Sequence, residues 1–318
     1  MNRNIALDVL KLIMAFMVVG IHANFMMDLS PLGNYLTVHG MFRIAVPVFF
    51  VINGYFFYYV LIKEQQLKWL RRVFILYITW MVFYSYFWFS IPDMSFISYA
   101  KLLKVVFFGY YHLWYIAGMI GAAVILLILR KLPSSILIIS IILTFLSGVI
   151  IQYLGNYHIF EGTFLDKLFN TNQMHRNMIF LAYPFFCTGY LINKHSLPSK
   201  ISLEHSFILS ILAIGALLGE SYFNFLQENR DGYFDNYFSL ILICPIIFIL
   251  FIKANIPGTN RNIALYSSSI YFIHVLILII LQKITALSPT YVMLFTILLS
   301  AFVSYFIIKI NKRLKFIL

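Results

Sequence analysis

Residues 5–27 read IALDVLKLIMAFMVVGIHANFMM, an apolar run interrupted by one Asp, one Lys and one His. A helix needs about 20 apolar residues to cross the hydrocarbon core of a bilayer. A signal peptide has a shorter apolar region followed by small residues at a cleavage site, and this run has neither feature. The sequence therefore predicts a first transmembrane helix that is retained.

The composition of the whole chain agrees with this prediction. Of its 318 residues, 62% are hydrophobic, 19% are aromatic and 11% are charged, and the mean hydropathy is +0.89. A soluble domain is about 45–50% apolar and about 25% charged. A water-soluble fold is excluded, because a compact protein of this length still exposes a large surface and could not hide this much hydrocarbon. A disordered chain, a coiled coil and a disulfide scaffold are excluded too, and we expect an all-α polytopic membrane protein.

Apolar stretches of similar length follow along the rest of the chain. Together they predict a bundle of about ten transmembrane helices, at residues 5–27, 42–62, 73–92, 112–129, 135–153, 178–193, 206–224, 237–253, 264–282 and 291–310. The stretch 96–108 is shorter and carries lysines, so we expect it to lie at the membrane interface as an amphipathic helix. No repeat or linker divides the chain, and we expect one transmembrane domain over residues 1–318.

The basic residues predict the orientation of the bundle. The chain has 23 Lys and Arg against 11 Asp and Glu, a formal net charge of +12. With the N-terminus in the cytoplasm, 15 of these cations fall on the inner side and 6 on the outer side, which is the asymmetry of the positive-inside rule. Both termini are therefore expected in the cytoplasm. Because topology accounts for the basic excess, we expect no nucleic-acid partner.

The loops on the predicted outer side have a different character. They hold most of the acids, such as Asp231 and Asp235, and they include the longest hydrophilic interval, residues 155–177. A loop of that length on a compact bundle is often functional. Plain surface exposure explains it equally well.

Ionisable residues inside an apolar span are costly and are functional candidates by default. The first span holds Asp8, Lys11 and His22. Asp8 and Lys11 are three residues apart and can pair on one helix face. Lys11 and His22 share nearly the same face, about 16 Å apart along the axis. A lysine that extends to the interface and an interfacial histidine are the structural alternatives.

The second span and its surroundings add further candidates. Arg43 precedes an apolar run that ends in Asn53 and Gly54. Arg43 suits either a site or the outer headgroup level, and Asn53 suits either a site or close helix packing. The basic cluster of Lys68, Arg71 and Arg72 follows on the inner side, where topology explains it. It would equally suit the phosphates of a nucleotide.

Two histidines lie in later spans, namely His112 near the start of one and His274 near the middle of another. The sequence contains no zinc-binding spacing, phosphate-binding loop, dinucleotide motif or nucleophile elbow. We therefore expect no metal site, and a covalent serine or cysteine mechanism has no local support. Intramembrane histidines with cationic neighbours suit general-base chemistry. The histidines in loops or at span ends and Arg176 carry little weight alone.

Four segments, taken in order, resemble a known family. They are Asp8–Lys11 with His22, the stretch RIAVPVFFVINGY at 43–55, HLWY at 112–115 and SIYFIH at 269–274. In order and spacing they are similar to the membrane proteins of acyltransferase family 3, over nearly the whole chain. Among its members, the chain looks most like those of the enterobacterial common antigen O-acetyltransferase type.

The resemblance implies a reaction. Members transfer an acyl group, usually acetyl from acetyl-CoA, to a hydroxyl of a cell-envelope glycan or its lipid-linked precursor. His22 matches the essential first-helix histidine of the family, the expected general base, and Arg43 matches the polar residue before the Val-Pro-x-Phe-Phe segment. We expect Arg43 or His112 to stabilise the developing oxyanion. Direct transfer and a transient acyl-histidine both remain open.

The resemblance also implies a donor site on the cytoplasmic side. Lys68, Arg71 and Arg72 fall where the family has its basic motif, and Lys11 stands where most members have Arg, which keeps the charge but loses the bidentate fork. Asn53 stands where Ser is commoner. Asp8 and His274 are further candidates. The expected partners are acetyl-CoA, the glycan or lipid-linked acceptor and the bilayer of a bacterial inner membrane.

Two alternatives stay open at this point. The same intramembrane charges could line the path of a transporter or exporter for a small molecule or a lipid-linked sugar. The transferred group could also be succinyl rather than acetyl. Consumption of the thioester would distinguish acyl transfer from transport. The mass of the product would distinguish acetyl transfer from succinyl transfer.

Overall fold

The computed structural model describes residues 3–230 and 234–318, and these residues are mainly helical. The only paired strands among them are β1 (Arg3–Asn4) and β2 (Pro257–Gly258), which run antiparallel with Arg3 opposite Gly258. The prediction of an all-α membrane protein is confirmed.

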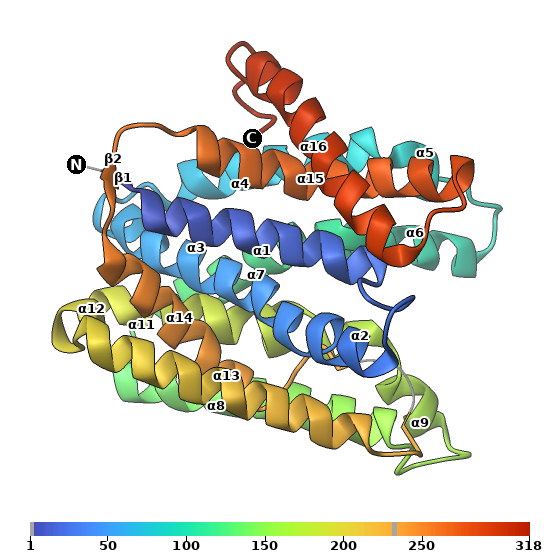
Figure 1. Ribbon diagram of the computed structural model, residues 1–318, viewed down its shortest axis with the longest axis horizontal. Coiled ribbons are helices and arrows are strands. Elements are labelled where there is room, and N and C mark those ends of the chain that lie inside the picture. Colours follow the sequence, from blue (N-terminus) through green and yellow to red (C-terminus); the bar gives the residue numbers. More distant parts are fainter. Residues whose placement is uncertain (1–2, 231–233) are drawn as a thin grey trace.

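The helices follow one another along the whole chain (Figure 1). The first half contains α1 (Ile5–Ala23), α2 (Pro31–Val38), η1 (Met41–Ile44), α3 (Ala45–Ile62), α4 (Gln66–Phe83), α5 (Ser85–Trp88), α6 (Phe96–Phe108), η2 (Tyr111–Leu113), α7 (Trp114–Leu129) and α8 (Ser134–Asn156). The second half contains α9 (Phe164–Phe169), α10 (Asn172–His175), η3 (Met178–Ala182), α11 (Tyr183–Lys194), α12 (Leu197–Lys200), α13 (Leu203–Phe225), α14 (Leu240–Ala254), α15 (Asn262–Ile284) and α16 (Pro289–Asn311).

Seven helical segments of the described chain are long and apolar enough to cross a membrane. They coincide with seven of the ten predicted spans. The other three predictions fall on different structures. The prediction at 73–92 falls on α4, which begins earlier and includes the basic cluster, and that at 178–193 falls on the π-helix η3 continued by α11. The prediction at 237–253 falls on α14, which has 15 residues.

The ends of α1 follow from two asparagines. The side chain of Asn4 accepts a hydrogen bond from the backbone N–H of Ala6 and caps the first turn. Asn24 adopts the left-handed conformation at φ 54°, and its N–H caps the carbonyls of Gly20 and Ile21. The helix therefore ends at Ala23, before the predicted boundary at residue 27.

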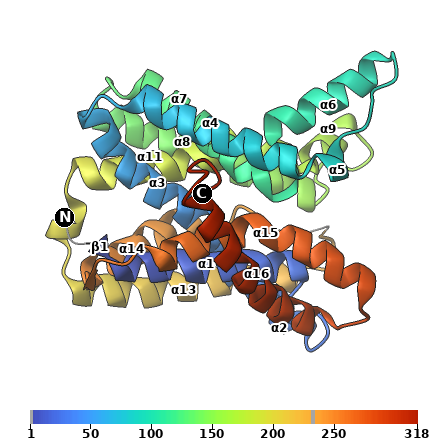
Figure 2. The ribbon, with the colours of Figure 1, turned by 90° about the horizontal axis from the view of Figure 1, so that it is seen from above.

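The helices form two groups that meet along α1 and α3. Figure 2 shows α3, α4, α7, α8 and α11 on one side and α1, α13, α14, α15 and α16 on the other. Helix α1 packs against both α15 and α3. In Figure 1, β1, β2 and α12 lie at one end of the bundle and α2, α6 and α9 at the other. We call these the inner and outer ends, after the predicted orientation.

Helices α3 and α11 approach each other very closely at two glycines. A Cβ atom on Gly54 would lie 1.8 Å from the backbone oxygen of Phe186, and one on Gly189 would lie 2.0 Å from the backbone oxygen of Val51. Small residues permit such contact between transmembrane helices. Of the two interpretations offered for Asn53-Gly54, packing therefore explains the glycine.

Substitution of Gly54 by Ala is expected to destabilise the protein, because the added methyl meets a backbone oxygen that has to move with its helix. Overpacking of this kind costs about 1–3 kcal/mol. Thermal unfolding of the detergent-solubilised protein measures the effect. Gly215→Ala on α13 is the matched control, since a Cβ there meets nothing within 4 Å and alanine favours a helix. Equal melting temperatures for the two variants would contradict this account of the interface.

Candidate active site

Three histidines from distant parts of the chain meet inside the bundle. They are His22 on α1, His112 in η2 and His274 on α15. The ring of His274 lies 5.4 Å from that of His22 and 5.1 Å from that of His112, centroid to centroid. The structure thus brings together the three intramembrane histidines that the sequence singled out.

The hydrogen bonds of His274 define its tautomer. Its Nδ1 lies 2.7 Å from the backbone oxygen of Tyr271, which can only accept, so the proton is on Nδ1. Its Nε2 is buried and has no hydrogen-bond partner among the described residues. In the neutral ring this nitrogen is an acceptor, placed beside the rings of His22 and His112.

Four rings contact one another at this depth, and we call Tyr111, His112, Tyr271 and His274 the aromatic layer. The hydroxyl of Tyr271 donates to the backbone oxygen of His112, which ties α15 to η2. The ring of Tyr111 lies 4.7 Å from that of His22. His22 therefore lies directly against this layer.

A cavity of about 210 Å³, here called the middle cavity, lies on the inner side of the aromatic layer. It extends from Lys11 and Phe56 to Tyr115 and Tyr271. The side-chain amide of Asn53 faces it and donates to the Tyr115 hydroxyl at 2.7 Å. A hydrogen-bonding amide is therefore available along a mainly apolar passage.

A larger cavity of about 640 Å³, here called the inner cavity, lies nearer the inner end and shares Lys11 and Phe56 with the middle cavity. Three cations, Arg3, Lys11 and Lys63, line it. The buried carboxylate of Asp8 pairs with Arg3 and lies 3.9 Å from the Lys11 amine, as the sequence spacing predicts.

The predicted basic cluster lies elsewhere. Lys68, Arg71 and Arg72 are exposed on α4 and line neither of these cavities. The buried face of α4 carries Val73 and Tyr77, and Lys68 and Arg71 fall on the other side of the helix at about 100° per residue. Arg72 donates to the backbone oxygen of Leu318 at 3.3 Å, and Leu318 lines the middle cavity. The structure therefore does not bring the cluster together with Lys11.

The outer side of His22 faces a cavity of about 560 Å³, here called the outer cavity. Its wall includes His22, Arg43 and Trp114, and it is rich in side-chain amides, contributed by Asn24, Asn156, Asn170 and Asn172. Amide groups both donate and accept hydrogen bonds. The cavity thus offers many partners for a polar molecule beside His22.

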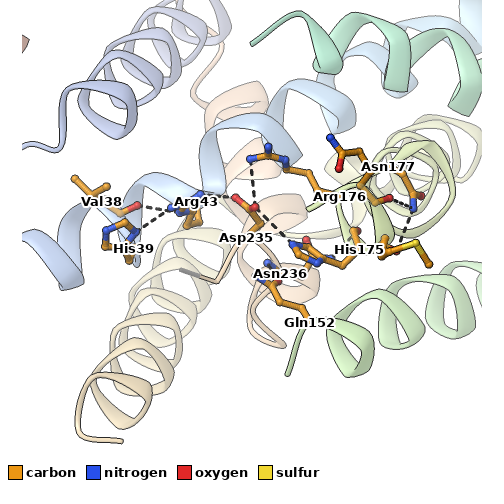
Figure 3. A network of polar contacts seen from close by, with 11 residues as sticks. Val38, His39, Arg43, Gln152, His175, Arg176, Asn177, Asp235 and Asn236 are labelled. Atoms are coloured by element: carbon orange, nitrogen blue, oxygen red, sulfur yellow. Dashed lines mark hydrogen bonds and ion pairs between the residues drawn. The ribbon is translucent and has the colours of Figure 1, made fainter. Parts of the chain in front are cut away.

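An ion network is built around Asp235 in the wall of the outer cavity (Figure 3). Arg43 and Arg176 both donate to its carboxylate, Arg176 at 3.3 Å, and the Nε2 of His175 lies 3.8 Å away. The Arg43 guanidinium also donates to the backbone oxygen of Val38 and lies 2.9 Å from the Nδ1 of His39. Arg43 is therefore a buried group whose guanidinium contacts Val38, His39 and Asp235.

The charge of Asp235 follows from these partners. Burial by itself would raise the pKa of the carboxyl, but the positive charges of Arg176 and Arg43 outweigh it and hold the pKa below its usual value. Asp235 belongs to a predicted outer loop, yet its side chain is only 12% exposed. Asp231, named with it, lies outside the described residues.

The segment that carries Asp235 is held by hydrogen bonds to neighbouring elements. The backbone N–H of Asn236 donates to Gln152 on α8, and the Asn236 amide donates to the backbone oxygen of His175. The carboxylate of Glu220 on α13 accepts from the N–H groups of Phe238 and Ser239. These contacts fix the carboxylate between the two arginines.

Sequence reasoning gave little weight to His39, His175 and Arg176, which belong to this network. Each stands in a polar stretch where an ionisable residue is ordinary. The one signal was the unusual length of the outer interval 155–177, which ends in His175-Arg176-Asn177. Of the two explanations for this interval, a functional loop and plain surface exposure, the lining of the outer cavity favours the functional loop.

Comparison with known proteins adds a family to this geometry. An amino-acid racemase of Enterococcus faecalis is 25% identical over 312 residues, which cover 91% of this chain and 43% of the relative. A serine/alanine racemase of Enterococcus gallinarum is 25% identical over 302 residues, which cover 86% and 40%. The chain thus spans about two fifths of the length of these relatives. No solved structure matches the chain. A family model described as an acyltransferase domain matches residues 4–309, and the chain belongs to this acyltransferase family.

Proposed function

We propose that the protein is a membrane O-acetyltransferase that moves an acetyl group from cytosolic acetyl-CoA to a hydroxyl of an envelope glycan. The supporting observation is the order of the cavities along the bundle. Cationic and apolar cavities lie on the inner side of the aromatic layer, an amide-rich cavity lies on the outer side, and His22 lies at the boundary. This order suits a donor and an acceptor that arrive from opposite sides of a bacterial inner membrane.

The inner side is assigned to the donor. The phosphates of acetyl-CoA would bind the cations of the inner cavity, where Arg3 and Lys63 join the predicted Lys11. The apolar and amide-bearing arm would follow the middle cavity past Asn53 and bring the thioester toward the aromatic layer. This route replaces Lys68 and Arg71 as first contacts of the donor and keeps the role of Lys11.

The transfer step is assigned to His22. Its neutral imidazole takes the proton of the acceptor hydroxyl as the hydroxyl oxygen attacks the carbonyl carbon of the thioester. The carbon–sulfur bond then breaks, and the sulfur leaves as a thiolate that takes up the proton held by His22. A new ester and a free thiol result.

Arg43 and His112 keep their proposed roles around the developing oxyanion. Arg43 lines the outer cavity together with His22, and its partners hold its guanidinium in place. The ring of His112 lies beside that of His274. The acceptor is assigned to the outer cavity, where amide side chains can hold sugar hydroxyls. The enterobacterial common antigen is the kind of glycan that the sequence resemblance suggests.

The first experiment measures transfer directly. The purified protein in proteoliposomes receives acetyl-CoA and envelope glycan, and free thiol and glycan mass are followed against liposomes without protein. The proposal expects thiol release together with an added mass of about 42 Da per sugar, the mass of an acetyl group replacing hydrogen. Movement of substrate without thiol release would favour transport, and the larger mass of a succinyl group with succinyl-CoA would change the donor.

Replacement of Lys11 by Met tests the donor route. We expect the KM for acetyl-CoA to rise by about tenfold, because a charge-assisted contact to phosphate is lost, while the rate at saturation changes little. Arg71→Gln is the matched control, since Arg71 lines neither inner-side cavity. A larger effect of Arg71→Gln than of Lys11→Met would return the donor phosphates to α4.

A further inference from the structure

A small pocket adjoins the outer cavity, and we call it the floor pocket. It has a volume of about 50 Å³ and shares His22, Arg43, Arg176 and Asp235 with the outer cavity. The residues that line the floor pocket but not the outer cavity are all apolar, namely Val18, Phe42, Val46, Pro47 and Leu181. A molecule in the outer cavity can therefore place a small apolar group in the floor pocket.

Three parts of the chain give the floor pocket the same gradient from polar to apolar. Each contributes a polar residue and an apolar residue that lies further toward the inner end of the bundle. These pairs are His22 and Val18 on α1, Arg43 and Val46 around the start of α3, and Arg176 and Leu181 around the start of η3. On α1 the two residues are about one helical turn apart. The charged groups therefore lie at the mouth of the pocket, and apolar side chains close its inner end.

The floor pocket and the middle cavity lie at adjoining depths. On α3, Pro47 lines the floor pocket and Phe49 lines the middle cavity. On α7, Trp114 lines the floor pocket and the next residue, Tyr115, lines the middle cavity. A thioester that reaches the aromatic layer from the inner side, as proposed for the donor, would therefore have its acyl group next to the floor pocket.

The size of the floor pocket limits what it can hold. A water molecule needs about 10–15 Å³ of cavity, so the volume of about 50 Å³ suits about three to five non-hydrogen atoms. An acetyl group, with two carbons and one oxygen, fits this space. A butyryl or succinyl group has twice as many carbons. The end of such a chain would project past His22 into the outer cavity, which is assigned to the acceptor.

We propose that the floor pocket holds the methyl of the transferred acetyl group, and that Leu181, Val18 and Val46 limit the length of the acyl chain. The carbonyl carbon then lies at the mouth of the pocket beside His22, with its oxygen toward Arg43. Val18 and Leu181 are 3% and 2% exposed, and close-packed side chains of this kind yield little to a longer chain. This inference rests on the proposed function and assigns its acyl specificity to named side chains.

The test measures acyl selectivity in proteoliposomes that contain the protein and envelope glycan. Acetyl-, propionyl-, butyryl- and succinyl-CoA are supplied in turn, and free thiol and product mass are followed. We expect kcat of the wild type to fall by about tenfold or more for each added methylene, since one methylene in an apolar pocket changes discrimination by about 10–200-fold. The KM is expected to change little, because the part common to the four thioesters is assigned to the inner and middle cavities.

Two variants widen the floor pocket. Leu181→Ala is expected to raise butyryl transfer relative to acetyl transfer by about tenfold or more. Val46→Ala lies on another element and is only half-buried. We expect it to change the selectivity in the same direction by a smaller factor, and it provides a second measurement if the Leu181 variant does not fold.

Leu217→Ala on α13 is the matched control. Leu217 is fully buried, as Leu181 is, but it lines none of the floor pocket and the outer, middle and inner cavities. The substitution removes the same atoms from the protein without widening the floor pocket. We therefore expect the selectivity of the wild type.

Three results would overturn the inference and leave the proposed function intact. These are transfer of butyryl or succinyl by the wild type as fast as acetyl, wild-type selectivity in folded Leu181→Ala and Val46→Ala, and the same change of selectivity in Leu217→Ala as in Leu181→Ala. Absence of thiol release from acetyl-CoA in the wild type is a different outcome. It would contradict the proposed function itself, and this inference with it.

Discussion

Replacement of His22 by Gln is expected to lower the rate of acetyl transfer by about 10²–10⁴-fold, the usual contribution of a general base. Glutamine keeps much of the size and hydrogen-bonding capacity of the side chain but cannot take up the proton of the hydroxyl. The KM for acetyl-CoA is expected to change little, since the inner cavity that we assign to the donor lies about three helical turns away. Thiol release in proteoliposomes measures both quantities.

His205→Gln is the control for this substitution. His205 lies at the exposed start of α13, where it contacts Ser202, and we expect full activity. Acetyl transfer at the wild-type rate in His22→Gln would contradict the assignment of His22 as the general base. The role of the base would then pass to His274 or to His112. The same measurement on His274→Gln and His112→Gln would decide between them.

Replacement of Asp235 by Asn is expected to have the largest effect on stability. The carboxylate lies between Arg43 and Arg176, and Arg43 is buried. Removal of one partner of a buried ion pair costs about 3–5 kcal/mol, because the remaining charge stays buried without compensation. Chemical unfolding of the detergent-solubilised protein checks the loss. Asp28→Asn is the control, because Asp28 is exposed and its hydrogen bonds to described residues are those with Ser288 and Thr290. Little change is expected.

The pH dependence of this contribution has a definite sign. The pKa of Asp235 is lower in the folded protein than its usual value, so the unfolded chain binds the proton more readily. The stabilisation is fully present above the unfolded-state pKa and is lost as the pH falls through the folded-state value. The difference in unfolding free energy between wild type and Asp235→Asn should therefore be constant near neutral pH and shrink only in strong acid. A difference that shrinks between pH 8 and 6 would contradict this assignment.

Much of the fold could be predicted from the sequence because the apolar spans are physically distinctive. A bilayer demands a long apolar segment, and seven predicted spans coincide with such helices. The predicted helix boundaries were least accurate where charged residues or a helix cap set the end of a helix. The cluster at Lys68 to Arg72 belongs to α4 rather than to a loop, and Asn24 ends α1 before residue 27.

The residues of the candidate site could likewise be predicted only in part. His22, His112 and His274 could be found because an ionisable residue stands out against an apolar background. Asp235, His39, His175 and Arg176 could not, because they lie in or beside polar segments where such residues are common. The contacts between these residues are long-range, since Arg43 and Asp235 are 192 residues apart in sequence. Single-sequence patterns carry no information about a contact of that kind.

The aromatic layer has a consequence for the energetics of the cell. The middle cavity and the outer cavity lie on opposite sides of the layer of Tyr111, His112, Tyr271 and His274, and in the predicted orientation they lie toward opposite aqueous compartments. A continuous file of water through the bundle would short-circuit the proton-motive force across the membrane. Under the proposed function, the rings would have to bring a thioester carbonyl to an acceptor and also keep such a leak closed, so their packing would serve electrical resistance as well as chemistry.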